Sequence, residues 1–231
     1  MQAVLTAITL LLLSTVVSAQ SAGLLVYQVW EEGIEPYVSR IMVTEDHVRL
    51  DEGSDTGGFT LFDRRQEIIY NVQPEDRSIL VMHAEEPVAD DGGSLILQEE
   101  VEVDDQAPKV AGAQPSVVRL LANGELCNEM VVIKGVMEDA LEGLRELKLS
   151  LARIQASTLE ATPLGMRTPC GLAANLYAAD RSLNFGLPLQ ERSSGRSQSL
   201  VDFVPDHDAD DVLFQLPDGF SRRSMFAPNV I

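Results

Sequence analysis

The residues best suited to hold a metal ion gather near the C-terminus, in the segment PDHDADD. This segment carries one imidazole and four carboxylates, from His207, Asp206, Asp208, Asp210 and Asp211. Such a set could ligate a divalent cation. The other two histidines, His47 and His83, stand alone, and no HExxH or similar spacing occurs. Because acidic runs are usually solvated, we expect a turn before a final strand, and predict no metal and no cofactor.

No nucleophile for catalysis stands out. The motif G-x-S-x-G is absent, and Ser116, Ser157 and Ser199 have no neighbouring His or Asp in a triad pattern. Walker and GxGxxG phosphate loops are absent too. A hydrolase that uses two carboxylates stays open, since the 36 acidic residues always offer pairs. Because no nucleophile is paired with a base, we predict a protein that is not an enzyme.

The chain has two cysteines, Cys127 and Cys170, which could form a disulfide. In an exported protein an even pair predicts a disulfide. The alternative is a pair of free or metal-binding thiols. The spacing is not CxxC and no histidine lies close in the sequence, so we favour the disulfide.

The chain is strongly acidic, with 17 basic and 36 acidic residues and a net charge of −19. Such a surface repels nucleic acid and anionic membranes. The composition therefore excludes nucleic acid as a partner and allows basic ones. The segment from Ala84 to Pro108 is acidic and loop-rich. We expect a short strand at 94–98 and a solvated loop at 90–93, with a calcium site as the alternative.

Residues 1–19 have the pattern of a cleavable signal peptide. An apolar run ends before Val17 and Ala19, the small residues that precede cleavage. The alternative is a membrane anchor, but the run is shorter than a span and no basic cluster follows it. We expect export to the periplasm and one domain over residues 20–231, with no membrane span in the mature chain.

The stretch from Tyr37 to Met82 predicts a five-stranded antiparallel meander. Its runs YVSRIMV, HVRL, FTLF, EIIYNV and SILVM are rich in β-branched and aromatic residues, and turn residues separate them. Arg40 and Arg49 fall on adjacent strands, where Asp51, Asp63 or Glu67 could pair with them on a solvated face. Before the meander, GLLVYQVW predicts a first strand that is apolar on both faces.

A helical insertion is predicted at about 128–180. Apolar residues recur at three- and four-residue steps at Val136, Ala140, Leu144, Leu147, Leu151 and Ile154. A second, shorter helix follows at about 171–180. Strands are expected again at LPLQER, QSLVDFV and VLFQLPDGF, and residues 221–231 read as a loose tail.

The order of these elements resembles exported envelope β-sheet proteins of the lipoprotein-carrier-like (LolA-type) group. The matching pieces are SRIMV, HVRLD, FTLFDRRQEIIYNV, GELC, GLPL and FQLPDGF, over most of residues 24–220. The resemblance implies an incomplete antiparallel barrel whose helices plug a concave apolar side that holds acyl chains. It implies no catalytic residue.

We therefore expect an α+β fold, a curved antiparallel β-sheet or half-barrel with an inserted, disulfide-clamped helical pair packed on one face. The expected function is binding of an apolar ligand, such as an acyl chain or a lipidated partner. The candidate wall residues are Leu25, Tyr27, Trp30, Met42, Phe62, Tyr70, Met82, Leu144 and Leu147. The alternative is a scaffold or adaptor that binds other proteins through an acidic surface.

Overall fold

The structure, a computed structural model, describes residues 19–83, 95–163, 165 and 167–225. The predicted signal peptide, apart from Ala19, lies outside the described residues, as does the acidic loop at 90–93. The described strands form one sheet in the order β12-β6-β5-β4-β3-β2-β1-β11-β10-β9-β8-β7. The strands are β1 (Ala19–Glu31), β2 (Tyr37–Val43), β3 (His47–Asp51), β4 (Phe59–Asp63), β5 (Ile68–Gln73), β6 (Ser78–Met82), β7 (Leu97–Val103), β8 (Ser116–Ala122), β9 (Glu125–Ile133), β10 (Leu187–Ser193), β11 (Arg196–Asp210) and β12 (Ser221–Ser224).

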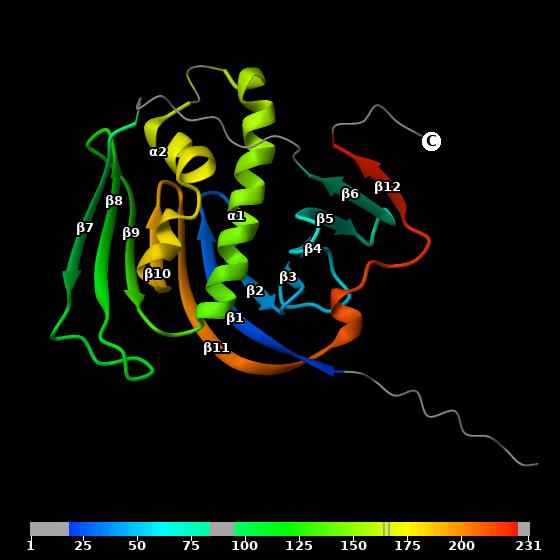
Figure 1. Cartoon of the computed structure of the whole chain (residues 1–231), viewed down its shortest axis with the longest axis horizontal. Coiled ribbons are helices and arrows are strands. Elements are labelled where there is room, and N and C mark those ends of the chain that lie inside the picture. The colour runs from blue at the N-terminus through cyan, green and yellow to red at the C-terminus, as the bar shows by residue number, and fades with distance from the viewer. Residues whose placement is uncertain (1–18, 84–94, 164, 166, 226–231) are drawn as a thin grey trace, which may run out of the picture.

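The sheet is open and curled, and it is antiparallel except where β12 joins β6 (Figure 1). The predicted meander is confirmed as β2 to β6, each strand pairing with the next. The turn between β5 and β6 places Arg77 at a φ of 49°, in the left-handed region that tight turns use. Local patterning and turn chemistry therefore account for this half of the sheet.

β1 is the centre of the sheet. It pairs with β2 on one side and with β11 on the other, from Ala19 opposite Asp210 to Glu31 opposite Arg196. Its residues alternate between two covered faces, as the near-continuous apolar run predicts. The helices lie on the inner side of the curl, and a C-terminal segment covers part of the outer side (Figure 1).

The helical insertion begins later than predicted. Residues 128–133 belong to β9, because their backbone pairs with both β8 and β10. Helix α1 (Glu138–Thr158) follows, then the single 3₁₀ turn η1 (Leu159–Ala161). The second helical stretch is confirmed as α2 (Pro169–Leu172), a π-helical turn η3 (Ala173–Tyr177) and a 3₁₀ helix η4 (Arg181–Phe185).

The disulfide Cys127–Cys170 is present and confirms that prediction. Its Cα atoms lie 5.1 Å apart, and it joins β9 to the first turn of α2. The sheet, the helices and the disulfide of the expected fold are thus all found.

Among the described residues, no helix has both the length and the apolar character that crossing a membrane requires.

The C-terminal predictions need two corrections. Residues 211–214 form the 3₁₀ helix η5 (Asp211–Phe214), not a strand, because Asp210 accepts a hydrogen bond from the Val212 amide and turns the chain. The predicted loose tail is wrong for its first four residues, since Ser221–Ser224 form β12 against the edge of β6. Hydrogen bonds with a free strand edge order this polar segment.

Candidate apolar site at the seam between β10 and β11

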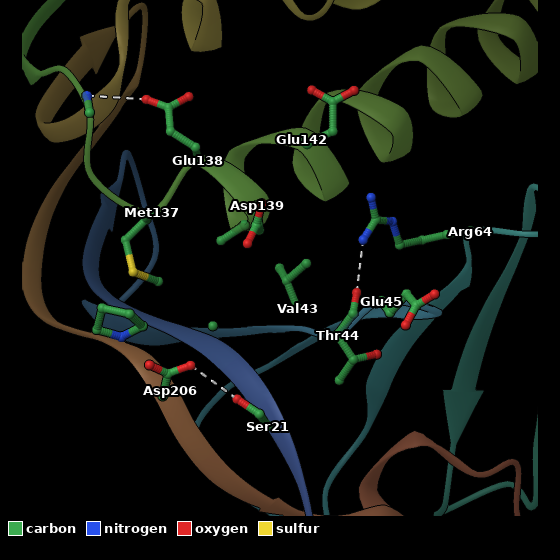
Figure 2. Close-up of a pocket in the computed structure, with 14 residues that line it drawn as sticks. Ser21, Val43, Thr44, Glu45, Arg64, Met137, Glu138, Asp139, Glu142 and Asp206 are labelled. Carbon is green, nitrogen blue, oxygen red and sulfur yellow. Dashed lines mark hydrogen bonds between the residues drawn. The ribbon is translucent and has the colours of Figure 1, made fainter.

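An acidic pocket of about 570 Å³ lies beside the start of α1 (Figure 2). It is lined by carboxylates from three elements of the chain, namely Glu45, Glu138, Asp139, Glu142 and Asp206. Its one cation, Arg64, is already occupied, because its Nε donates to Glu146 at 2.6 Å and its Nη1 donates to the Thr44 carbonyl at 2.8 Å. Figure 2 shows one contact between a hydroxyl and a carboxylate among these residues, the hydrogen bond of 3.3 Å that Ser21 donates to Asp206. The charge of the pocket is dominated by its carboxylates.

The predicted turn at PDHDADD is wrong. β11 continues through Asp210, with His207 opposite Ala22 and Asp208 opposite Ser21. Alternation along the strand sends neighbouring side chains to opposite faces. Over the described ranges 19–83, 95–163, 165 and 167–225, no three His, Cys, Asp or Glu side chains gather closely enough to hold a metal ion.

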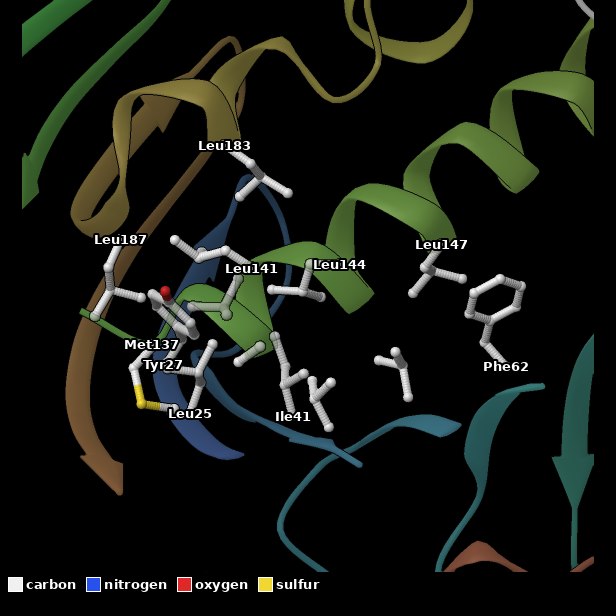
Figure 3. Packing of buried hydrophobic residues seen from close by; sticks show 14 of the residues in the cluster. Leu25, Tyr27, Ile41, Phe62, Met137, Leu141, Leu144, Leu147, Leu183 and Leu187 are labelled. Carbon is white, nitrogen blue, oxygen red and sulfur yellow. The ribbon is translucent and has the colours of Figure 1, made fainter. Parts of the chain in front are cut away.

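Most of the predicted wall residues do meet under α1 (Figure 3). The cluster between α1 and the inner face of the sheet includes Leu25, Tyr27, Phe62, Leu144 and Leu147, with Met82 packed against it. The helix lies close to the strands, since a Cβ added at Gly143 would come within 2.6 Å of Val43. The predicted stripe is wrong at Leu151, which is 44% exposed on the outer face of α1.

Three of the predicted wall residues lie elsewhere. Met42 and Tyr70 belong to a second cluster on the outer face of the sheet, which Phe214 of η5 helps to cover. Trp30 is 43% exposed near the end of β1. The error has a physical reason. Strands that are covered on both faces carry apolar residues on both, so composition alone does not assign a side chain to one face.

Tyr27 lies at a seam in the sheet, the place where β10 and β11 stop pairing. β10 pairs with β11 only from Gln190 to Ser193. β11 continues along β1, while Leu187 and Pro188 stay paired with β9 and Leu189 lies at a bulge. The Tyr27 hydroxyl reaches from β1 to this gap and donates a hydrogen bond of 3.1 Å to the Pro188 carbonyl. Burial, with a smaller effect of the Glu191 charge, raises the pKa of Tyr27 above its ordinary value.

The apolar core comes to the surface at this seam. A groove of about 460 Å³ opens there, and its apolar lining includes Val110, Val131, Leu189, Leu200, Val201 and Phe203. Leu189, Leu200 and Phe203 are half-buried and also pack against the cluster under α1. The groove is therefore continuous with the core in which most of the predicted wall residues lie.

The loop between β7 and β8 forms one rim of the groove, through Ala107, Pro108 and Pro115. The loop is held by its own polar groups. The Gln114 side-chain amide donates to the Asp104 and Ala107 carbonyls, and Val110 and Ala113 bond each other through their backbones. The sequence did not predict this groove, because the groove forms where β10 and β11 separate, and strand pairing between distant segments is not visible in the sequence. The only local signal was Pro188, which lacks an N–H to donate to a neighbouring strand.

No protein-family model and no curated protein matches the sequence. Solved structures are similar over most of the chain, and two of them are described here. An uncharacterized conserved protein from Thermus thermophilus is 11% identical with a TM-score of 0.44, covering 89% of this chain and 91% of that one. PNGF-II is 12% identical with a TM-score of 0.39, covering 88% of this chain and 31% of that one. Likeness at this level carries no function across, so the chain is described by its own residues as a curled antiparallel β-sheet protein with a disulfide-linked helical insertion.

Proposed function

We propose that this protein binds an apolar ligand, an acyl chain or the acyl group of a lipidated partner, in the groove between β10 and β11. The observation that carries the proposal is the groove itself, where half-buried apolar side chains open onto the core. Its volume of about 460 Å³ falls in the range of small-molecule sites, and such sites are mostly apolar. In this proposal the curled sheet acts as a half-barrel, with α1 as its plug.

The head group of the ligand is neutral or cationic in this proposal. The chain has a net charge of −19, and Asp202 lies at the groove. A carboxylate or phosphate on the ligand would be repelled by these charges. The resemblance of the sequence to the lipoprotein-carrier-like group supports an acyl ligand. The pattern of residues 1–19 and the disulfide support an exported, periplasmic protein.

Uptake of a neutral fluorescent probe, N-phenyl-1-naphthylamine, tests the site. We expect fluorescence to rise on mixing with the wild-type protein and saturate. The variant Val131→Trp places a large ring in the groove and is expected to weaken uptake by roughly tenfold, because it fills the space that the probe occupies. Native mass spectrometry of the proteins as purified should show bound lipid in the wild type and much less in Val131→Trp.

The matched control is Ile34→Trp, at a 58% exposed position in the turn after β1, and it should bind the probe like the wild type. Absence of both probe uptake and bound lipid would refute the proposal. Equal uptake by Val131→Trp and the wild type would place any apolar site away from this groove.

A further inference from the structure

β7 is an edge strand of the described sheet. It is the last strand in the order, and within the described residues β8 is its only strand partner. All seven of its residues are exposed. Such an edge offers unpaired backbone groups to any extended chain that fits it.

The register shows which backbone groups face outward. The Asn123 amide donates to the Ile96 carbonyl at 2.8 Å, and the Asp104 amide donates to the Pro115 carbonyl at 3.1 Å. Both bonds continue the ladder that pairs Leu97 with Ala122 and Val103 with Ser116. Hydrogen-bonded pairs alternate along an antiparallel ladder. The even-numbered residues therefore bond to β8, and the odd-numbered residues of β7 direct their N–H and C=O groups to the open edge.

The two faces of β7 differ in chemistry. The inner face carries Leu97, Val101 and Val103, which are 40%, 52% and 55% exposed. The same face carries Glu99, which accepts a hydrogen bond from Arg181 of η4. α2 and its neighbours lie against β8 and β9, so the apolar inner residues of β7 are left uncovered.

The outer face of β7 is acidic. Gln98, Glu100 and Glu102 alternate with the apolar residues, and Arg119 of β8, which lies opposite Glu100, pairs with Glu129. Acidic side chains along an edge oppose pairing with a second copy of the same strand, because glutamates would then face glutamates. The same charges favour a basic strand.

We propose that the β7 edge binds an extended segment of a protein partner by β-strand addition, and that this segment alternates apolar residues with lysine or arginine. An added strand continues the pleat of the sheet, so its alternate side chains lie on opposite faces. Its apolar residues would lie beside Val101 and Val103, and its basic residues beside Glu100 and Glu102. This site shares no residue with the apolar groove, so the two proposals are tested independently of each other.

Fluorescence anisotropy with three labelled nonapeptides tests the proposal on the full chain. The first alternates lysine with valine, the second alternates glutamate with valine, and the third is the first with alternate backbone amides N-methylated. We expect the lysine peptide to bind and the glutamate peptide not to bind. The N-methylated peptide should bind at least about tenfold more weakly, because it keeps the charge but loses backbone donors.

Variants of β7 separate edge pairing from attraction by charge. Glu100→Lys with Glu102→Lys should lose the lysine peptide, whereas Glu32→Lys with Glu35→Lys makes the same charge change in a distant turn and should retain it. Val101→Pro removes one outward N–H and no bond to β8, so it should fold yet bind at least about fivefold more weakly. Val101→Thr keeps that N–H as its control.

The proposal is overturned if the lysine peptide does not bind, or if the N-methylated peptide binds equally well. The proposal is also overturned if a folded Val101→Pro protein binds the lysine peptide as tightly as the wild type does. Should Val101→Pro fail to fold, the N-methylated peptide decides the question with wild-type protein.

Discussion

Arg49 and Asp51 form an ion pair inside the covered outer face of the sheet. The Arg49 Nε donates to Asp51 Oδ2 at 2.7 Å, and the two side chains are 2% and 0% exposed. The Arg49 Nη1 donates to the Leu213 carbonyl at 2.6 Å, and its guanidinium lies 3.8 Å from the centre of the Phe59 ring. The pair therefore holds η5 against β3. The predicted pairing with Asp51 is confirmed, but the predicted solvated face is wrong, because η5 covers it.

Removing the Asp51 charge should strongly destabilise the fold. Asp51 accepts hydrogen bonds from Arg40, from Arg49 and from the Gly53 amide. Asp51→Asn leaves Arg49 charged and buried, so we expect the free energy of unfolding in urea to fall by about 3 kcal/mol. Asp55→Asn is the control, since the exposed Asp55 pairs with the same Arg40 and should cost less than about 1 kcal/mol. Equal costs would contradict a special role for the buried pair.

Acid should weaken the same contact. Burial raises the pKa of the Asp51 carboxyl, but the hydrogen bonds from Arg40 and Arg49 together outweigh it, and the pKa lies below its ordinary value of 3.8. A lowered pKa in the folded state stabilises the fold above the unfolded pKa, and that stability is lost as the pH falls through the folded pKa. Urea midpoints measured from pH 6 downward, with values taken about every half unit, should therefore drop below about pH 4 more steeply for the wild type than for Asp51→Asn. Parallel curves would contradict the assignment.

The disulfide should contribute measurably to stability. It closes a sequence separation of 43 residues between β9 and α2. Replacing both cysteines by serine should lower the free energy of unfolding by roughly 2–4 kcal/mol, because the unfolded chain gains freedom. Dithiothreitol should lower the melting temperature of the wild type and leave the double variant unchanged, since the chain has two cysteines. A wild type that is insensitive to reduction would contradict this.

We expect that close packing against the sheet requires a glycine at position 143, although glycine has a low helix propensity. Alanine in a helix is favoured over glycine by about 1 kcal/mol, yet its Cβ would lie 2.6 Å from Val43 Cγ1. We expect Gly143→Ala to destabilise the protein by about 1–3 kcal/mol, measured by thermal unfolding. A double-mutant cycle with Val43→Ala should recover part of this loss, because the smaller side chain makes room. A stabilised Gly143→Ala would mean that α1 lies farther from β2.

Tyr27→Phe tests the hydrogen bond across the seam. Loss of the hydroxyl leaves the Pro188 carbonyl without that donor and should cost about 1–3 kcal/mol. The raised pKa of Tyr27 also sets the direction in which stability changes with pH. Its stabilisation is complete below the ordinary value of 10.0 and is lost as the pH rises through the higher folded pKa. The gap in stability between wild type and variant should therefore narrow above pH 10, which urea titrations at pH 8 and at about pH 10.5 would detect.

Much of the meander could be predicted because its signals are local. Alternating β-branched runs and the turns between them specify β2 to β6 without reference to distant residues. The helix at 138–158 was equally local in its apolar spacing. β12 could not be predicted in this way, since Ser221–Ser224 is polar and becomes a strand only by pairing with β6.

The candidate site was predicted in part. Leu25, Tyr27, Leu144 and Leu147 meet as expected, because helix and strand periodicities place them on facing surfaces. Met42 and Tyr70 could not be assigned to a face, because both faces of their strands carry some apolar residues. The groove depends on β11 leaving β10 after Ser199, a matter of which strands pair.

The sequence by itself determined the strands of the meander, the helix at 138–158, the acidity and the cysteine pair. Each follows from residue chemistry within a short window of chain. Only the tertiary structure decided that β1 pairs with β11, that the C-terminal segment buries Arg49, and that a seam opens beside Leu200. These features join residues far apart in the chain, and their free energy comes from contacts that exist only once the sheet has curled around α1.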